Sequence, residues 1–117
     1  MEGFRMQQLE EQFQALKETC TNAQVFEESG YTYIYIPDQK MPPGCKPPVS
    51  DVILCPQEHS GYTSRLFFKD IIQTPKQLNW NGQAFILGQQ WHAFSFNNVA
   101  NMPLLNMVIN HLRGLVA

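Results

Sequence analysis

The sequence has few charged side chains and no cluster of basic ones. It holds 8 Lys and Arg against 10 Asp and Glu, and the basic residues are scattered singly along the chain. Proteins that bind nucleic acid use a basic patch to neutralise phosphate groups. Because such a patch is missing here, we expect no nucleic-acid partner.

The sequence also lacks long apolar runs and a regular set of cysteines. No stretch approaches the roughly 18 uncharged apolar residues that a membrane span requires, and the first residues do not resemble a signal peptide. Cys20, Cys45 and Cys55 are odd in number and irregularly spaced, which argues against a disulfide framework and fits a reducing compartment. We therefore expect a cytoplasmic protein with free thiols and no membrane contact.

Motifs for cofactors and metals are missing as well. The chain contains neither of the glycine-rich loops that cradle nucleotide phosphates. Cys45, Cys55 and His59 lack the paired spacing that preorganises a tetrahedral zinc site. From Trp80 to Phe96 there is no Asp or Glu, which disfavours a hydrolase built on paired carboxylates. We expect no cofactor and no metal site.

What the sequence does contain predicts a single α+β domain over residues 1–117. Hydrophobic residues make up 44% of the 117 residues, which is enough apolar surface for one core. Apolar residues at helical spacing predict an amphipathic helix from Phe4 to about Thr21. Short apolar runs bounded by turn residues then predict four strands, joined as an antiparallel meander, at 24–28, 31–36, 49–55 and 66–68.

The second of these strands alternates tyrosine with other residues. Side chains alternate along a strand, so we expect Ile34 and Ile36 to face the core. The three tyrosines opposite them either lie against the first helix or form a contact surface. The prolines between 37 and 48 predict a stiff loop, because proline cannot donate to a sheet ladder. Cys45 in this loop is expected to be exposed, and Cys55 on the next strand to be buried.

The segment from 71 to 101 is the least regular part of the chain, and we expect an irregular aromatic segment there. The pair Asn81-Gly82 favours a tight hairpin turn. The run WHAFSF at 91–96 alternates like a strand but is equally compatible with an aromatic loop packed on the sheet. The aromatic residues of this segment fit either simple core packing or a protein-binding face.

A closing helix is predicted after Pro103, which suits the first helical position following a cap at Asn101 or Met102. Its apolar face is expected to contain Leu105, Val108, Ile109, Leu112 and Leu115. His111 is expected on the opposite, solvated face.

This order of elements resembles the ubiquitin-conjugating-enzyme (E2-like, UBC-like) superfamily, and several short motifs are similar to its prokaryotic branch, E2 family E. The motifs are Pro42-Pro43-Gly44 ahead of an apolar strand, Pro56 at that strand's end, the Gly61-Tyr62 turn, and Trp91 followed by Phe94-Ser95 before a terminal helix. The resemblance implies a role in a bacterial ubiquitin-like pathway. Expected partners are a ubiquitin-like protein or an activating-enzyme homologue, with a JAB-type peptidase possible in the same pathway.

The sequence departs from a working member of that superfamily at one point. Such an enzyme carries its thioester on a cysteine in the passage after the fourth strand, and here residues 71–101 contain no cysteine. The chain is therefore expected to be a non-catalytic binding protein. The residues expected to bind a partner are Trp80, Trp91, Phe94, Tyr62 and Pro43.

Two alternatives remain open at the level of sequence. One is an active transferase that uses a displaced cysteine, with Cys45 as nucleophile, because Lys46 beside it could lower the thiol pKa, and with His92 as the assisting acid or base. The other is a dimeric, secretion-chaperone-like binding protein, since such proteins are also small, mildly acidic α+β domains.

Overall fold

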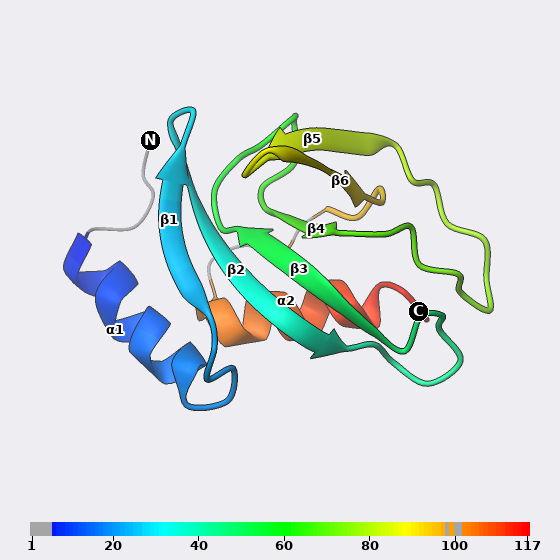
Figure 1. The fold of residues 1–117 in the computed structure, drawn as a ribbon, viewed down its shortest axis with the longest axis horizontal. Coiled ribbons are helices and arrows are strands. Elements are labelled where there is room, and N and C mark those ends of the chain that lie inside the picture. Colours follow the sequence, from blue (N-terminus) through cyan, green and yellow to red (C-terminus); the bar gives the residue numbers. More distant parts are fainter. Residues whose placement is uncertain (1–5, 98, 100–101) are drawn as a thin grey trace.

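The structure, a computed structural model, describes residues 6–97, 99 and 102–117. Within these residues the chain forms two helices and a six-stranded antiparallel sheet, which confirms the α+β class. The elements are α1 (Met6–Lys17), β1 (Gln24–Glu28), β2 (Tyr31–Lys40), β3 (Val49–Cys55), β4 (Arg65–Phe68), β5 (Gly82–Ile86), β6 (Gln89–Ala93) and α2 (Leu104–Arg113) (Figure 1). Neither helix is long and apolar enough to cross a membrane, as judged over these described residues.

The sheet has the strand order β1-β2-β3-β4-β6-β5. The four predicted strands are present as consecutive antiparallel neighbours. The expectation that an irregular segment follows them is wrong for residues 82–93, which form the hairpin β5–β6 and join the sheet beside β4. Its turn is Leu87-Gly88, where both residues have positive φ, at 52° and 77°. Asn81-Gly82 instead begins β5, so the predicted turn at that pair is also wrong.

Strand β2 is longer than its sequence suggests. It continues through Pro37 to Lys40, with a break in register between Ile36 and Gln39. Pro37 cannot donate to the ladder, and a bulge at this point accommodates it. Asp51 on β3 secures the bulge, since its carboxylate accepts the Asp38 backbone N–H at 2.9 Å and the Tyr35 hydroxyl at 3.0 Å.

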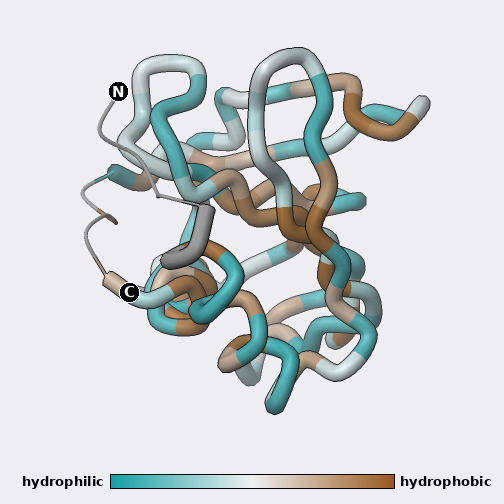
Figure 2. The backbone as a smooth tube through the Cα atoms, turned by 90° about the vertical axis from the view of Figure 1, so that its left-hand side faces the viewer, coloured by the Kyte–Doolittle hydropathy of each residue, from teal (hydrophilic) through white to brown (hydrophobic). Residues whose placement is uncertain are grey.

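The two faces of the sheet bury two separate cores. Ile34 and Ile36 lie in the core beneath the helices, as predicted. The opposite face is covered by the β5–β6 hairpin, so that Tyr33 packs with Ile53 and Trp91. The tyrosine face of β2 therefore does not lie against the first helix, because the hairpin lies there, and Tyr31 and Tyr35 are partly exposed at its margin. Figure 2 shows the apolar segments gathered in the middle of the molecule, with most hydrophilic segments in its outer turns.

The hairpin curls the sheet back toward its first strand. Trp91 is 1% exposed, its indole N–H donates to the Ile86 carbonyl at 3.0 Å, and its ring meets Tyr35 edge-on at 6.3 Å. At the hairpin tip the Leu87 backbone N–H lies 3.3 Å from both carboxylate oxygens of Glu28, at the end of β1. The turn of the β5–β6 hairpin, at one edge of the sheet, therefore contacts the end of β1 at the other edge, and the sheet forms a curved half-shell.

Helix α2 crosses the opposite face, behind β2 and β3 in Figure 1. The buried residues of the helix are Leu104, Met107, Val108 and His111. The predicted apolar face is thus displaced by about one position, and Ile109 is exposed. His111 was expected to be solvated but is buried, because the Ser64 hydroxyl lies 2.9 Å from its Nε2 and satisfies it.

The start of α2 is capped by the other helix. Pro103 is the cap position and offers no side-chain hydrogen bond, so the predicted cap at Met102 is wrong, while Asn101 lies outside the described residues. The Gln12 side-chain oxygen of α1 accepts the Leu104 backbone N–H at 3.1 Å. This bond satisfies one of the free amides at the start of α2 and ties the two helices together.

Candidate functional site

Three loops meet at the beginning of β4 and bring a set of polar side chains together. They are the connection from β3 to β4, the residues just before β5 and the residues just after β6. We call the group formed by Tyr62, Arg65, Asn81 and Ser95 the loop cluster. Tyr62, Asn81 and Ser95 are at least partly exposed to solvent, and Arg65 lies beneath them.

Arg65 is the buried centre of the loop cluster and is 3% exposed. Its Nη2 donates to Asn81 Oδ1 at 2.8 Å and to the Phe94 carbonyl at 3.3 Å. Its guanidinium carbon lies 3.9 Å from the centre of the Tyr62 ring, which is a cation–π contact. The guanidinium also passes over Gly82, where a Cβ atom would lie 2.8 Å from Nη1. Only glycine leaves this space.

The Tyr62 hydroxyl is the outer centre of the loop cluster. It lies 2.8 Å from Ser95 Oγ and accepts a hydrogen bond from Asn81 Nδ2 at 2.9 Å. These two bonds, and behind them the charge of Arg65, lower the pKa of Tyr62. The phenol, the amide and the serine hydroxyl are therefore held in a fixed arrangement on the surface.

Local sequence explains how Tyr62 reaches this position. His59 and Tyr62 exchange two backbone hydrogen bonds, of 2.9 and 3.0 Å, across the two residues Ser60 and Gly61. Both of these have positive φ, at 56° and 87°, which is the backbone of a type I′ turn. A glycine in the second position makes this turn accessible. The Gly61-Tyr62 turn noted in the sequence is therefore present, and it directs Tyr62 toward Arg65.

The same turn places His59 on the inner side of the loop. Its Nε2 lies 3.2 Å from the Tyr33 hydroxyl and its Nδ1 lies 2.8 Å from Ser60 Oγ. Burial, and to a smaller extent the charge of Arg65, lowers the pKa of His59. A neutral histidine with both nitrogens occupied packs the core and is not free to ligate a metal.

None of the three thiols has the environment of a reactive cysteine. Cys45 is 6% exposed, so the expectation that it is exposed is wrong. The segment after β4 covers it, since Lys46 and Gln73 pair backbone to backbone at 2.9 and 2.7 Å. Burial raises the pKa of Cys20 and of Cys45, and it raises the pKa of Cys55 to about 11. Thiols of this kind are poor nucleophiles.

The residues expected to bind a partner do not converge on one surface. Trp91 and Phe94 are 1% and 4% exposed, and each belongs to a different core, so neither presents a surface. Trp80 is half-buried and meets Phe94 at 5.3 Å. Pro43 is exposed, but it lies before β3 whereas Tyr62 follows it, so the two residues occupy opposite ends of that strand. Of these five residues, Tyr62 alone belongs to the loop cluster, where it contacts Asn81, the residue after Trp80.

His92 lies on β6, half-buried, where it pairs with Phe68 of β4 and Gln83 of β5. Its catalytic role stays a prediction. Sequence reasoning missed the central residue of the loop cluster, Arg65. A lone arginine at the start of the buried run Leu66-Phe67-Phe68 was the available signal, because a charge in such a position needs partners.

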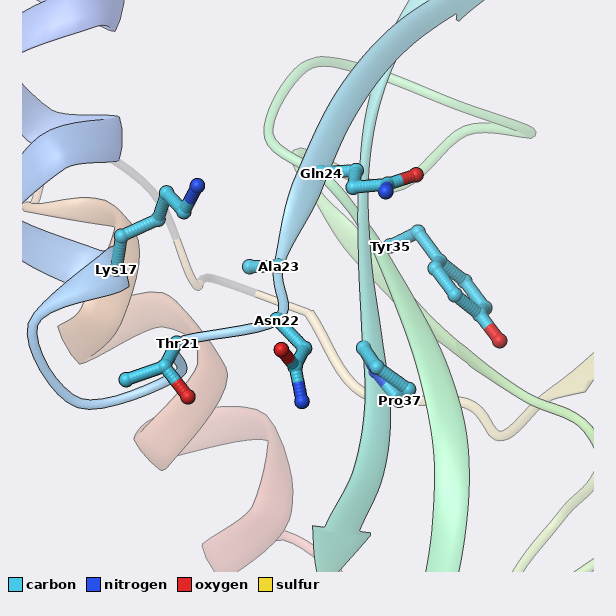
Figure 3. A pocket seen from close by; sticks show the side chains of 7 residues that line it. All are labelled: Lys17, Thr21, Asn22, Ala23, Gln24, Tyr35 and Pro37. Atoms are coloured by element: carbon cyan, nitrogen blue, oxygen red, sulfur yellow. The ribbon is translucent and has the colours of Figure 1, made fainter.

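A separate polar cleft of about 440 Å³ lies between the turn after α1 and strand β2 (Figure 3). Its lining is Lys17, Thr21, Asn22, Ala23, Gln24, Tyr35 and Pro37. A neighbouring hollow of about 310 Å³ shares part of this wall and includes Cys20 and Asp38. Burial raises the pKa of Cys20, so the thiol in this wall is a poor nucleophile near neutral pH.

Among the described residues no group of three or more His, Cys, Asp or Glu side chains is placed to hold a metal ion. In comparisons with known proteins, no family model, curated protein or solved structure matched this chain. The loop cluster is therefore the candidate site on the strength of its own geometry.

Proposed function

We propose that this chain is a non-catalytic, E2-like binding module of a bacterial ubiquitin-like modification pathway, and that it works in the cytoplasm. Its partner is a ubiquitin-like protein or the activating-enzyme homologue of that pathway. The surface that meets this partner is the loop cluster, together with the neighbouring Trp80.

The order of the elements supports the family part of the proposal. A leading helix, four strands paired in succession and a closing helix follow the layout of the ubiquitin-conjugating superfamily. If the chain belongs to that superfamily, the passage that would carry the thioester cysteine is residues 71–101, which include the β5–β6 hairpin. The family motifs at Pro42-Pro43-Gly44 and at Gly61-Tyr62 both lie in turns that join the central strands.

The state of the thiols supports the non-catalytic part. A conjugating enzyme needs an accessible thiol that ionises near neutral pH. Cys45 lies beside Gln73, at the start of the passage 71–101 that follows the fourth strand, yet it is buried and its pKa is raised. Displaced catalysis at this cysteine would require the covering segment to move.

The single observation that carries the binding part is the preorganised surface of the loop cluster. Tyr62, Asn81 and Ser95 hold each other by hydrogen bonds of 2.8 and 2.9 Å above Arg65. Tyrosine, tryptophan and arginine are the residues enriched at the energetic centres of protein interfaces. A rigid polar surface loses little conformational entropy when a partner docks on it.

The test is a calorimetric titration of the chain with a ubiquitin-like protein and with an activating-enzyme homologue of the proposed pathway. We expect one of them to bind, and Asn81→Ala to weaken that binding about tenfold or more. Asn106→Ala, the same change at an exposed position of α2, is the matched control and should bind like the parent. Absence of binding to both proteins would remove the pathway assignment. A reducible adduct that Cys45→Ala abolishes would overturn the non-catalytic part.

A second candidate function, a dimeric chaperone-like binding protein, is favoured by the free edge of β5. Ile86 and Gln89 flank a two-residue turn and form a hydrogen-bonded pair, so the backbone groups of Gln83 and Phe85 point away from β6. Phe85 is 72% exposed and Leu87 51% exposed, and the strand carries no charge. Edge strands without charged or proline residues are open to pairing with another chain.

The occupant that suits this edge is a second copy of the same strand. An antiparallel pair of β5 strands centred on Ala84 would bring no like charges together, whereas the other edge, β1, carries Glu27 and Glu28. The mass in solution, measured by light scattering, decides the matter. A dimer that Phe85→Lys dissociates would support this function, and a monomer at every concentration would exclude it.

A further inference from the structure

Arg65 is a buried cation whose partners are all neutral. Among the described residues it donates to an amide oxygen and a backbone carbonyl and stacks on a phenol ring, and no carboxylate pairs with it. Buried charges in proteins are ordinarily paired with an opposite charge, because removing an ion from water costs several kcal/mol that neutral dipoles repay only in part. The site is therefore short of one negative charge.

The positive charge of Arg65 affects the groups around it. It is a secondary cause, after burial, of the lowered pKa values of His59 and His111. It also contributes to the lowered pKa of Tyr62, after the hydrogen bonds from Ser95 and Asn81. Two groups in the β3–β4 connection and one in α2 thus have pKa values lowered in part by a cation that no carboxylate among the described residues neutralises.

The exposed surface above Arg65 presents hydrogen-bond donors to solvent. Asn81 uses one N–H on the Tyr62 hydroxyl, which leaves its second N–H to a ligand. Tyr62 and Ser95 share one proton between their oxygens, so the other hydroxyl proton is available outward. From Gln77 to Leu112 the chain has no Asp, Glu, Lys or Arg, so two of the three loops carry no charge of their own.

We propose that the loop cluster binds a carboxylate of a protein partner, an Asp or Glu side chain, on the donors of Tyr62, Asn81 and Ser95, with Arg65 as the compensating cation beneath. This inference rests on the proposed function, because the docked partner supplies the carboxylate. A carboxylate fits better than a larger anion. The donors lie close together, since Asn81 Nδ2 is 2.9 Å from the Tyr62 hydroxyl, and Gly82 lies against the far side of the guanidinium.

The probe is sodium acetate, titrated into the ¹⁵N-labelled full chain while sodium chloride keeps the ionic strength constant. We expect saturating shifts of the backbone amides of Thr63, Asn81 and Ser95 with acetate and none with chloride alone. Ser95→Ala should weaken acetate binding about threefold to tenfold, the worth of one hydrogen bond. Equal responses to acetate and to chloride would overturn the proposal.

Asn81→Asp adds a carboxylate beside Arg65 and also removes the amide donor of the site, so it tests both parts of the site together. The new carboxylate replaces the amide oxygen that lies 2.8 Å from Nη2, so it supplies the missing charge from within the chain. We expect this variant to lose the acetate response, while Asn106→Asp, the matched control on α2, keeps it. An acetate response retained in Asn81→Asp would overturn the proposal.

The two proposals fail separately in these experiments. If a pathway protein binds the chain while acetate leaves the loop-cluster amides unchanged, the proposed function stands and the carboxylate site is wrong. If acetate binds and neither pathway protein does, the site stands and the proposed partner is wrong.

Discussion

Nε2 of His111 lies 2.9 Å from Oγ of Ser64 in the middle of the protein, and this contact joins the closing helix to the start of β4. Ser64 Oγ donates its own proton to the Val99 carbonyl, so it accepts from His111 and fixes the tautomer with hydrogen on Nε2. The pair resembles a serine–histidine dyad in its composition alone. A serine that is fully buried and a histidine that donates to it cannot perform nucleophilic catalysis.

The burial of His111 predicts a loss of stability in acid. Burial, with a smaller contribution from Arg65, lowers its pKa from 6.5 to about 4. Between these values the unfolded chain binds a proton that the folded chain excludes, so stability rises with pH across the window. The contribution is fully present above about pH 6.5 and is lost as the pH falls to 4, with a span of about 3 kcal/mol. Urea unfolding at a series of pH values measures it.

His111→Gln is the variant that isolates this effect, because glutamine keeps a donor for Ser64 and does not titrate. We expect its unfolding free energy to vary less with pH between 4 and 6.5 than that of the parent. His59 also has a lowered pKa and accounts for part of the remaining slope, in the same direction. An unchanged slope in His111→Gln would show that the histidine is not buried in its neutral form.

Thiol reactivity is predicted to be slow and to begin at Cys20. Cys20 is half-buried, whereas Cys45 and Cys55 are buried, and burial raises the pKa of all three. With Ellman's reagent at neutral pH we expect a slow first phase that Cys20→Ser removes, and full reaction only on unfolding. A fast phase lost in Cys45→Ala would contradict this order and favour the displaced-cysteine transferase.

Gly82→Ala is predicted to displace Arg65. The added Cβ would lie 2.8 Å from Nη1, so the guanidinium must leave its place between Gly82 and Tyr62. The expected cost is about 1 to 3 kcal/mol of unfolding free energy, as for other overpacked sites. The pKa of Tyr62 should rise toward its ordinary value, which a spectrophotometric titration follows. Gly30→Ala, whose Cβ meets nothing within 4 Å, loses stability only through backbone strain at its φ of +84° and should leave Tyr62 unaffected.

Gln12→Ala is predicted to weaken the contact between the helices. The Gln12 oxygen caps the Leu104 amide at 3.1 Å, and losing a cap costs about 1 kcal/mol. Gln14→Ala, on the exposed side of the same helix, is the control and should change stability little. Equal stabilities of the two variants would show that the cap contributes nothing.

Local sequence patterns correctly predicted which side chains of strand β2 face the helices. Ile34 and Ile36 point to the helix side because strand side chains alternate, and this outcome needed no knowledge of the rest of the chain. The β5–β6 hairpin was missed for a local reason. Asn81-Gly82 carried the stronger turn signal, whereas the real turn places a leucine, Leu87, at positive φ.

The remaining differences come from contacts between distant parts of the chain. His111 is buried because Ser64, 47 residues earlier, satisfies it, and no helical pattern contains that information. Cys45 is buried because the segment around Gln73 pairs across it. The sequence indicated part of the loop cluster. Tyr62 was among the expected binding residues, whereas Arg65 and Ser95 join the cluster only because three loops meet in the fold.

A map of amide shifts in the ¹⁵N-labelled chain, on addition of a ubiquitin-like protein or an activating-enzyme homologue of the proposed pathway, decides whether the loop cluster is the binding surface. We expect the shifted amides to gather at residues 60–65, 79–82 and 94–97, around Tyr62 and Asn81. Shifts confined to the β5 edge, to the polar cleft beside α1 or to Cys45 would contradict this expectation, and so would a spectrum that neither protein changes.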